Sequence, residues 1–180
     1  MTEQPRTPPG AGSSATDAHW MTPAQLDHWL SFVAVVELLP GALDAQLQAD
    51  AGISHYEYFL LAQLSEAPDR TLRMTELAGA TNATLPRLSH VVKRLEGRGY
   101  LERFPCPDDK RATNAHLTAA GWAKVVATAP GHVAEVRRHV IDALDPQQLR
   151  ALGEASAAIL ATLDPPIGFP VRRGSVSPAD

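Results

Sequence analysis

The sequence predicts a mainly α-helical protein that contains one small β-hairpin. Two observations predict this fold class. Apolar residues recur at helical spacing through most of the chain, and only two short runs alternate in the manner of strands. A third observation bounds the size of the molecule. Its 180 residues suffice for a sizeable core, while a single cysteine excludes an internal disulfide framework and a multi-cysteine metal site.

The two ends of the chain differ in composition from the rest. Residues 1–19 are rich in Pro, Gly, Ser, Thr and Ala, and residues 164–180 hold few large apolar groups. Neither stretch can bury enough apolar surface to offset its ordering entropy, so both are expected to be disordered tails. No secretory signal is visible, and no stretch reads as long and apolar enough to cross a bilayer. A cytoplasmic protein without a membrane partner is therefore expected.

The first helix is expected within residues 20–52. Thr22 is an N-cap residue by type, Pro23 fits the first turn, and apolar residues then recur at helical spacing. The Pro40-Gly41 pair is expected to bend or break this helix. A second helix is expected to start at Ser54 and to end before Pro68.

A helix-turn-helix is expected next. Residues 72–74 are too few to classify alone but allow a small strand, and a short helix over 76–80 follows, which Thr75 is expected to cap. A turn follows, and Thr84 is expected to cap a longer helix that runs to residue 97. Where the two helices touch, Ala78 supplies the small residue that the motif needs.

The remaining elements are a hairpin and two helices. Residues 100–104 and 114–117 alternate as two strands around a polar turn. Thr118 is expected to cap a long helix that runs to about residue 144 with a kink at Pro130-Gly131. An Asp-Pro pair then starts a last helix over 145–163.

Charge is distributed unevenly along the chain. The net charge of the whole protein is −4, but residues 70–111 hold nine basic and five acidic side chains, a net charge of +4, and the remainder carries −8. Attraction to phosphates needs local positive charge rather than a basic protein. Residues 70–111 are therefore the expected contact region for a nucleic acid.

The longer helix of the helix-turn-helix has two chemically distinct faces. Its apolar stripe consists of Leu85, Leu88, Val91, Val92 and Leu95. The opposite face presents Arg87, His90 and Arg94, flanked by Pro86, Ser89 and Lys93. A helix with an apolar back and a basic, hydrogen-bonding front of this size fits the major groove of DNA, where side chains read base edges.

The hairpin that follows is interpreted as a wing. Its turn spans residues 105–113, and Lys110 and Arg111 at its tip can follow the DNA backbone or enter the minor groove. Asp109 is expected to hold the Arg111 guanidinium in one rotamer through a charge-assisted hydrogen bond.

These runs resemble the MarR family of bacterial regulators, which are winged helix-turn-helix proteins. The similarity lies in residues 74–78, in the run from Leu88 to Arg103, in the wing residues 107–112, and in residues 117–121. It covers roughly residues 22–163. The alanine- and proline-rich composition is typical of a high-GC actinobacterial genome.

The resemblance implies a sequence-specific double-stranded DNA-binding regulator, most often a repressor, that acts as a homodimer on a pseudo-palindromic operator. Residues 53–117 would then form the winged DNA-binding domain, with dimerisation helices in 20–52 and 118–163. The DNA-binding residues expected on this basis are Thr84, Pro86, Arg87, Ser89, His90, Lys93, Arg94, Asp109, Lys110 and Arg111. Leu85-Pro86 departs from the polar residues that members often carry there, which shifts base reading toward Arg87, His90 and Arg94.

The resemblance also implies release from DNA by a small effector, commonly an aromatic acid. The candidate pocket residues are Trp29, Phe32, His55, Tyr56 and Tyr58, although aromatic residues at helical spacing more often belong to a core. No cofactor is expected.

The same residues bear on other functions. An enzyme is not expected because no phosphate loop, nucleophile elbow or carboxylate cleft is visible. His132, Glu135 and His139 share one helical face but suit a solvated surface better than a zinc site, and His28 has no visible partner. Two alternatives stay open: a winged helix used for protein–protein assembly, and a redox-sensing regulator acting through Cys106, which otherwise is expected to be a semi-exposed loop residue.

Overall fold

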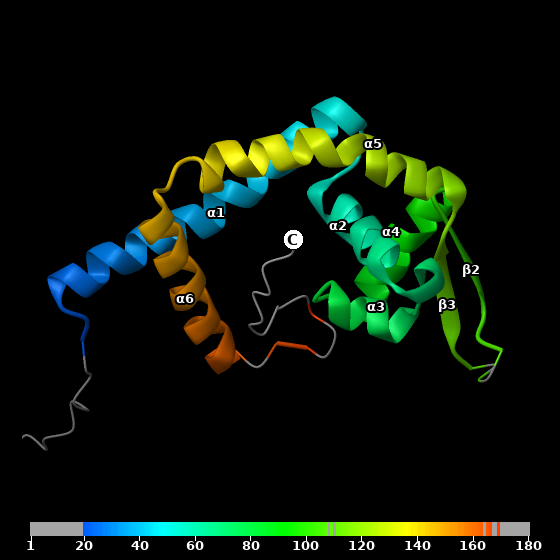
Figure 1. The fold of residues 1–180 in the computed structure, drawn as a ribbon. Coiled ribbons are helices and arrows are strands. Elements are labelled where there is room, and N and C mark those ends of the chain that lie inside the picture. The colour runs from blue at the N-terminus through cyan, green and yellow to red at the C-terminus, as the bar shows by residue number, and fades with distance from the viewer. Residues whose placement is uncertain (1–19, 108, 110, 164, 167–168, 170–180) are drawn as a thin grey trace, which may run out of the picture. The chain divides into compact units, whose positions relative to one another are not determined.

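A computed structural model describes residues 20–107, 109, 111–163, 165, 166 and 169 (Figure 1). The predicted tails, 1–19 and 164–180, lie almost entirely outside the described residues, as does Lys110. The chain divides into two compact units, residues 1–37 and residues 38–180. The first unit contributes the N-terminal part of helix α1 (Pro23–Ala51), which Thr22 caps by accepting a hydrogen bond from the Gln25 N–H.

The second unit begins with the C-terminal part of α1 and holds a winged helix-turn-helix. Its elements in order are α2 (His55–Glu66), β1 (Thr71–Arg73), α3 (Met74–Ala80), α4 (Leu85–Gly97), β2 (Leu101–Pro105), β3 (Thr113–Leu117), α5 (Ala119–Val136) and α6 (Pro146–Leu163). Figure 1 shows α2, α3 and α4 gathered beside the β2–β3 hairpin. The fold class predicted from the sequence is confirmed.

The sheet has three antiparallel strands in the order β1-β3-β2. Thr71 pairs with His116 on one side of β3, and Leu101 pairs with Leu117 on the other. The short run over 72–74 that read as a possible strand is therefore the outer strand of the wing, shifted by one residue.

One hydrophobic core joins α2, α3 and α4 to the sheet. It contains the buried face of α4, together with leucines of α2 and α3 and residues of β2, β3 and α5: Leu60, Leu61, Leu64, Leu77, Ala78, Leu88, Val91, Val92, Leu95, Leu101, Ala115, Leu117 and Val125. The predicted stripe of α4 is thus buried, with one correction. Leu85 is 45% exposed because it lies in the first turn, beyond the reach of the core.

Side-chain caps fix several helix starts where the sequence predicts them. Ser54 accepts a hydrogen bond from the Glu57 N–H, and Thr118 accepts one from the Gly121 N–H. Asp145 accepts from two N–H groups in the first turn of α6. Each bond satisfies a donor that the helix itself leaves without a partner.

Other boundaries differ from the predictions. Pro40 and Pro130 lie inside continuous helices, and the break after α5 comes instead at a π-helical turn, Arg137–Ile141. Helix α3 starts at Met74, so Thr75 lies within it instead of capping it. Thr84 occupies the N-cap position of α4, but its side chain makes no capping bond.

The predicted absence of a segment able to cross a membrane is wrong by length and composition. Helix α1 contains an 18-residue stretch of mean hydropathy 1.5, of which 11% is buried. A helix that is covered by another protein surface meets the same criterion. Length and hydropathy therefore do not distinguish a membrane from a protein surface as the partner of α1.

Candidate nucleic-acid interface

Helix α4 presents a polar face to solvent. Arg87, Ser89, His90, Lys93 and Arg94 are all exposed, while the opposite face is buried in the core. Thr84 and Pro86 are exposed at the start of the same helix. The two-faced helix predicted from the sequence is therefore present, and its N-terminus adds partial positive charge on the exposed side.

Arg94 is held by an acidic residue that the sequence analysis did not connect with it. Its Nε donates to Oε1 of Glu57 over 2.8 Å, and the Glu57 side chain is 5% exposed against 58% for Arg94. Glu57 Oε2 also accepts from the Ser54 N–H over 2.8 Å. Burial would raise the pKa of the Glu57 carboxyl, but the Ser54 hydrogen bond and Arg94 together lower it below its ordinary value.

Arg87 is supported by an aromatic ring. The Arg87 guanidinium carbon lies 4.9 Å from the centre of the Tyr56 ring, within the range of a cation–π contact. The Tyr56 hydroxyl is 3.1 Å from Oγ1 of Thr81. Tyr56 therefore joins α2 to the turn after α3.

The wing turn corrects one predicted contact. Oδ1 of Asp109 accepts a hydrogen bond of 3.0 Å from the backbone N–H of Arg111, so the carboxylate holds the turn and not the guanidinium. A side chain two residues before an N–H reaches it easily, which is the geometry of an Asx turn. Arg111 itself is exposed, as the interpretation of a wing-tip residue requires.

Arg103 joins the wing to α4, the candidate recognition helix. Its side chain donates to Oε2 of Glu96 from both Nε and Nη2, at 3.1 Å and 2.6 Å, and its N–H donates to Oε1 over 3.2 Å. The side-chain bonds with Arg103 lower the pKa of Glu96. Three bonds between the end of α4 and β2 fix the wing relative to the helix.

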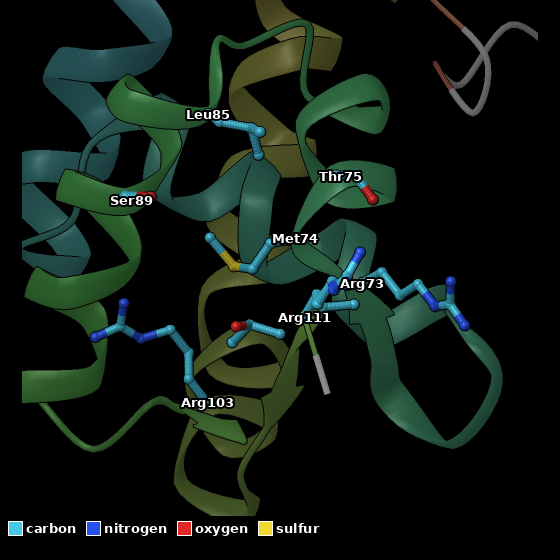
Figure 2. Close-up of a pocket in the computed structure, with 9 residues that line it drawn as sticks. Arg73, Met74, Thr75, Leu85, Ser89, Arg103 and Arg111 are labelled. Atoms are coloured by element: carbon cyan, nitrogen blue, oxygen red, sulfur yellow. The ribbon is translucent and has the colours of Figure 1, made fainter. Parts of the chain in front are cut away.

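A pocket of about 270 Å³ lies between α3, α4 and the wing. Figure 2 shows Ser89 and Leu85 on the α4 side, with Arg103 below them and Arg73 and Arg111 opposite. The full lining is Arg73, Met74, Thr75, Leu85, Ser89, Arg103, Arg111, Ala112 and Thr113. Three arginines and three hydroxyl-bearing residues line this one opening, a composition that suits an anion. Arg73 and Arg103 were not among the predicted site residues, because sequence spacing does not show that β1 and β2 flank the same opening.

The candidate effector residues do not form one group within either unit. Trp29 and Phe32 are exposed on the N-terminal part of α1, with ring centroids 6.1 Å apart. In the second unit, His55 and Tyr58 contact His132 of α5, with ring centroids 5.7 and 4.7 Å apart. Burial lowers the pKa of His55 and of His132.

The structure also bears on the metal-binding and redox-sensing alternatives. Among the described residues, no group of three or more potential ligands is close enough to hold a metal ion. Glu135 pairs with Arg138 and His139, while the His132 ring packs against the rings of His55 and Tyr58. Cys106 is 5% exposed and not semi-exposed as predicted, because its N–H donates to Ala112 and prolongs the hairpin.

Comparisons with known proteins identify the family. The MarR family model matches residues 53–113. Among solved structures, the chain is similar to Sco3205 of Streptomyces coelicolor, a MarR family transcriptional regulator that was solved in complex with DNA. The two sequences are 45% identical, and the TM-score is 0.79. The similarity covers 83% of this chain and 94% of the Sco3205 chain. It is also similar to AbsC, a MarR family regulator of the same organism, with 36% identity, a TM-score of 0.77, and coverage of 81% and 97%.

A curated relative gives the same result over a shorter stretch. The chain is 31% identical over 88 residues to the HTH-type transcriptional repressor YetL of Bacillus subtilis, which covers 49% of this chain and 53% of YetL. The chain thus spans about half the length of the curated relatives that it matches. These relatives are regulators and not enzymes, and the Sco3205 similarity extends over most of both chains. The two-faced helix, the three-stranded wing and these similarities together place the chain in the MarR family of transcriptional regulators.

Proposed function

We propose that the protein binds a specific double-stranded DNA operator, with α4 in the major groove and the wing beside it. The observation that carries the proposal is the exposed basic face of α4 next to a pocket lined by three arginines. Arg87, His90 and Arg94 are the proposed base-reading side chains, and Thr84, Pro86, Ser89 and Lys93 flank them. The DNA complex of the similar protein Sco3205 supports this assignment.

The three-arginine pocket is proposed to receive a backbone phosphate. Arg73 and Arg111 supply the charge, because the Arg103 guanidinium is paired with Glu96, and the hydroxyls of Ser89 and Thr75 supply further donors. Lys110, outside the described residues, keeps its predicted phosphate contact at the tip of the wing. Asp109 contributes indirectly, by fixing the turn that carries Arg111.

The protein is proposed to act as a homodimer. Large apolar side chains are exposed along α1, α5 and α6, as expected of surfaces that a second copy covers. They include Leu26, Trp29, Leu30, Val35, Val36, Leu38, Val126, Val133, Leu152, Ile159 and Leu163. This proposal accounts for the high hydropathy of α1 without a membrane and places the protein with the chromosome in the cytoplasm. The dimer would match a pseudo-palindromic operator.

Repression and release by an effector complete the proposal. The relative YetL is named a repressor, which supports that direction of regulation. The exposed aromatic pair Trp29 and Phe32 is the proposed contact for a small aromatic acid. Tyr56 is not retained there because it supports Arg87.

Binding to DNA upstream of the protein's own coding region tests the proposal. Labelled fragments from that region and a shuffled fragment of equal length are titrated at several salt concentrations, and the mass of the free protein is measured by light scattering. We expect tighter binding to a native fragment, a steep loss of affinity with salt, and twice the chain mass of 19.3 kDa. Equal and weak binding to both DNAs by a folded dimer would favour the protein-assembly alternative. Extraction of the protein only with detergent would favour a membrane role for α1.

A further inference from the structure

We propose that the first turn of α2 determines operator specificity, because Glu57 and Tyr56 hold Arg94 and Arg87 of the recognition helix in fixed orientations. The inference rests on the proposed DNA-binding function. It assigns a positioning role to two residues that do not lie on the exposed face of α4.

The Glu57–Arg94 pair has the geometry of a support. Among the described residues Arg94 bonds through Nε alone, so the two Nη groups and their four N–H donors remain for DNA. Glu57 is itself fixed, since it is 3% exposed and bound through its other oxygen to the Ser54 N–H. A fixed, buried carboxylate thus orients an exposed guanidinium.

The Tyr56–Arg87 contact has the same geometry with a different chemistry. The aromatic ring attracts the guanidinium through its π face, a contact that does not itself consume any of the N–H donors. The ring is anchored in turn, because the Tyr56 hydroxyl contacts Thr81, whose own hydroxyl donates to the Leu77 carbonyl over 2.7 Å. Thr81 is 4% exposed, so this chain of contacts ends inside the domain.

The two supported arginines belong to one reading surface. Arg87 and Arg94 are seven residues apart on α4, which brings them to the same face two turns apart. Their supports are consecutive residues of α2. The same turn of one helix therefore orients both ends of the basic face of another.

Orientation matters for specific binding more than for affinity in general. A base edge accepts hydrogen bonds from one guanidinium geometry, and an arginine that is already ordered loses less conformational entropy on binding. Non-specific attraction to phosphates depends on charge and tolerates many side-chain rotamers. Loss of a support should thus lower the ratio of specific to non-specific affinity.

A rival explanation makes the opposite prediction for Glu57. If this carboxylate only neutralised Arg94, its removal would add positive charge and raise affinity for all DNA. The substitution Glu57→Gln distinguishes the two, because glutamine keeps the size of the side chain and an acceptor for Ser54 but loses the charge. The positioning role predicts a lower ratio of specific to non-specific affinity, whereas neutralisation alone predicts higher affinity for all DNA and an unchanged ratio.

The experiment measures affinity for the operator fragment and for a shuffled fragment of equal length, using the full-length dimer. For Glu57→Gln we expect the ratio of the two affinities to fall about tenfold, with non-specific affinity equal or higher. Arg94→Lys, a surface change that keeps the charge, should lower the ratio similarly. Added to Arg94→Ala, Glu57→Gln should have no further effect on the ratio, since the side chain that it positions is gone.

Two matched controls separate positioning from other effects. Glu76 makes the equivalent bond in α3, where its carboxylate accepts from the Arg73 N–H, and Glu76→Gln changes the net charge by the same amount. The Glu76→Gln variant should keep the wild-type ratio of specific to non-specific affinity. For the second support, Tyr56→Phe keeps the ring under Arg87 and should keep most of the ratio, whereas Tyr56→Leu should lower it several-fold.

The outcomes are distinguishable. A wild-type protein that binds no DNA specifically would defeat the proposed function itself. If the wild type is specific but Glu57→Gln leaves the ratio unchanged or raises it, or lowers it equally in the Arg94→Ala background, the positioning role is wrong.

Discussion

A Cβ atom built on Gly121 would lie 1.9 Å from the carbonyl oxygen of Tyr100. The same carbonyl accepts a hydrogen bond from the Thr118 N–H, which ties the start of α5 to the segment between α4 and β2. The backbones of the two segments approach so closely that only glycine fits. The close contact between the Tyr100 backbone and α5 therefore depends on the absence of a side chain at residue 121.

Gly121→Ala should destabilise the protein by at least about 2 kcal/mol, because backbone atoms must move to admit the methyl group. Unfolding in urea measures the change. Gly153 of α6 provides the control, since a Cβ there would meet nothing within 4 Å and alanine favours a helix. Equal stability of the two variants would show that the α5 junction yields easily.

Arg111→Ala should weaken DNA binding about tenfold and reduce the salt dependence by about one counterion, because Arg111 lines the proposed phosphate pocket. The dimer should remain intact, since the side chain is exposed on the wing. Fluorescence anisotropy across a salt series gives both quantities. Arg150→Ala, on the exposed surface of α6, is the control for the loss of one charge. An Arg111→Ala variant with the wild-type salt slope would contradict the phosphate assignment.

Stability should fall as the pH is lowered from 7.5 to 5.5. Burial lowers the pKa of His55 and of His132 in the folded state from 6.5. Attraction from Asp44 opposes the shift of the His55 pKa, and repulsion from His55 adds to the shift of the His132 pKa. Below pH 6.5 the unfolded chain thus binds more protons than the folded one. The stability contribution is complete above pH 6.5 and is lost as the pH falls through the folded pKa values.

Urea unfolding at intervals of half a pH unit checks this prediction. His132→Gln should flatten the loss of stability between pH 7 and 5.5, whereas His28→Gln, at an exposed position of α1, should retain it. A loss of the same size in both variants would assign the pH dependence to other groups.

Cys106 should react with a thiol reagent on the order of 100-fold more slowly in the folded protein than in urea, because its side chain is 5% exposed. Absorbance of the released thiolate measures both rates. Peroxide treatment that leaves operator binding unchanged would agree with a structural cysteine. Rapid reaction in the folded state, with loss of DNA binding, would restore the redox-sensing alternative.

Local signals in the sequence were sufficient for most helix limits. Ser54, Thr118 and Asp145 are caps whose bonds reach only two or three residues, so residue type and position reveal them. Proline was a poorer guide. Pro40 and Pro130 lie on exposed parts of their helices, where solvent can satisfy the carbonyl that loses its N–H partner, and neither helix ends there.

Contacts between distant residues were beyond the reach of the sequence patterns. Glu57 and Arg94 are 37 residues apart, and Arg73 reaches the wing pocket only through the pairing of β1 with β3. Charge and helical periodicity identified α4 as the basic helix, but its supports depend on how α2 packs. Cys106 was misjudged for a related reason, since hairpin pairing beyond β2 covers a residue that its proline neighbours mark as loop.

The successive residues Tyr56 and Glu57 cannot be moved independently, because one helical backbone carries both. Their neighbours His55 and Tyr58 rest on His132 of α5. A small rotation of this single turn would loosen both arginines at once, so loss of operator recognition would be abrupt and would require no unfolding.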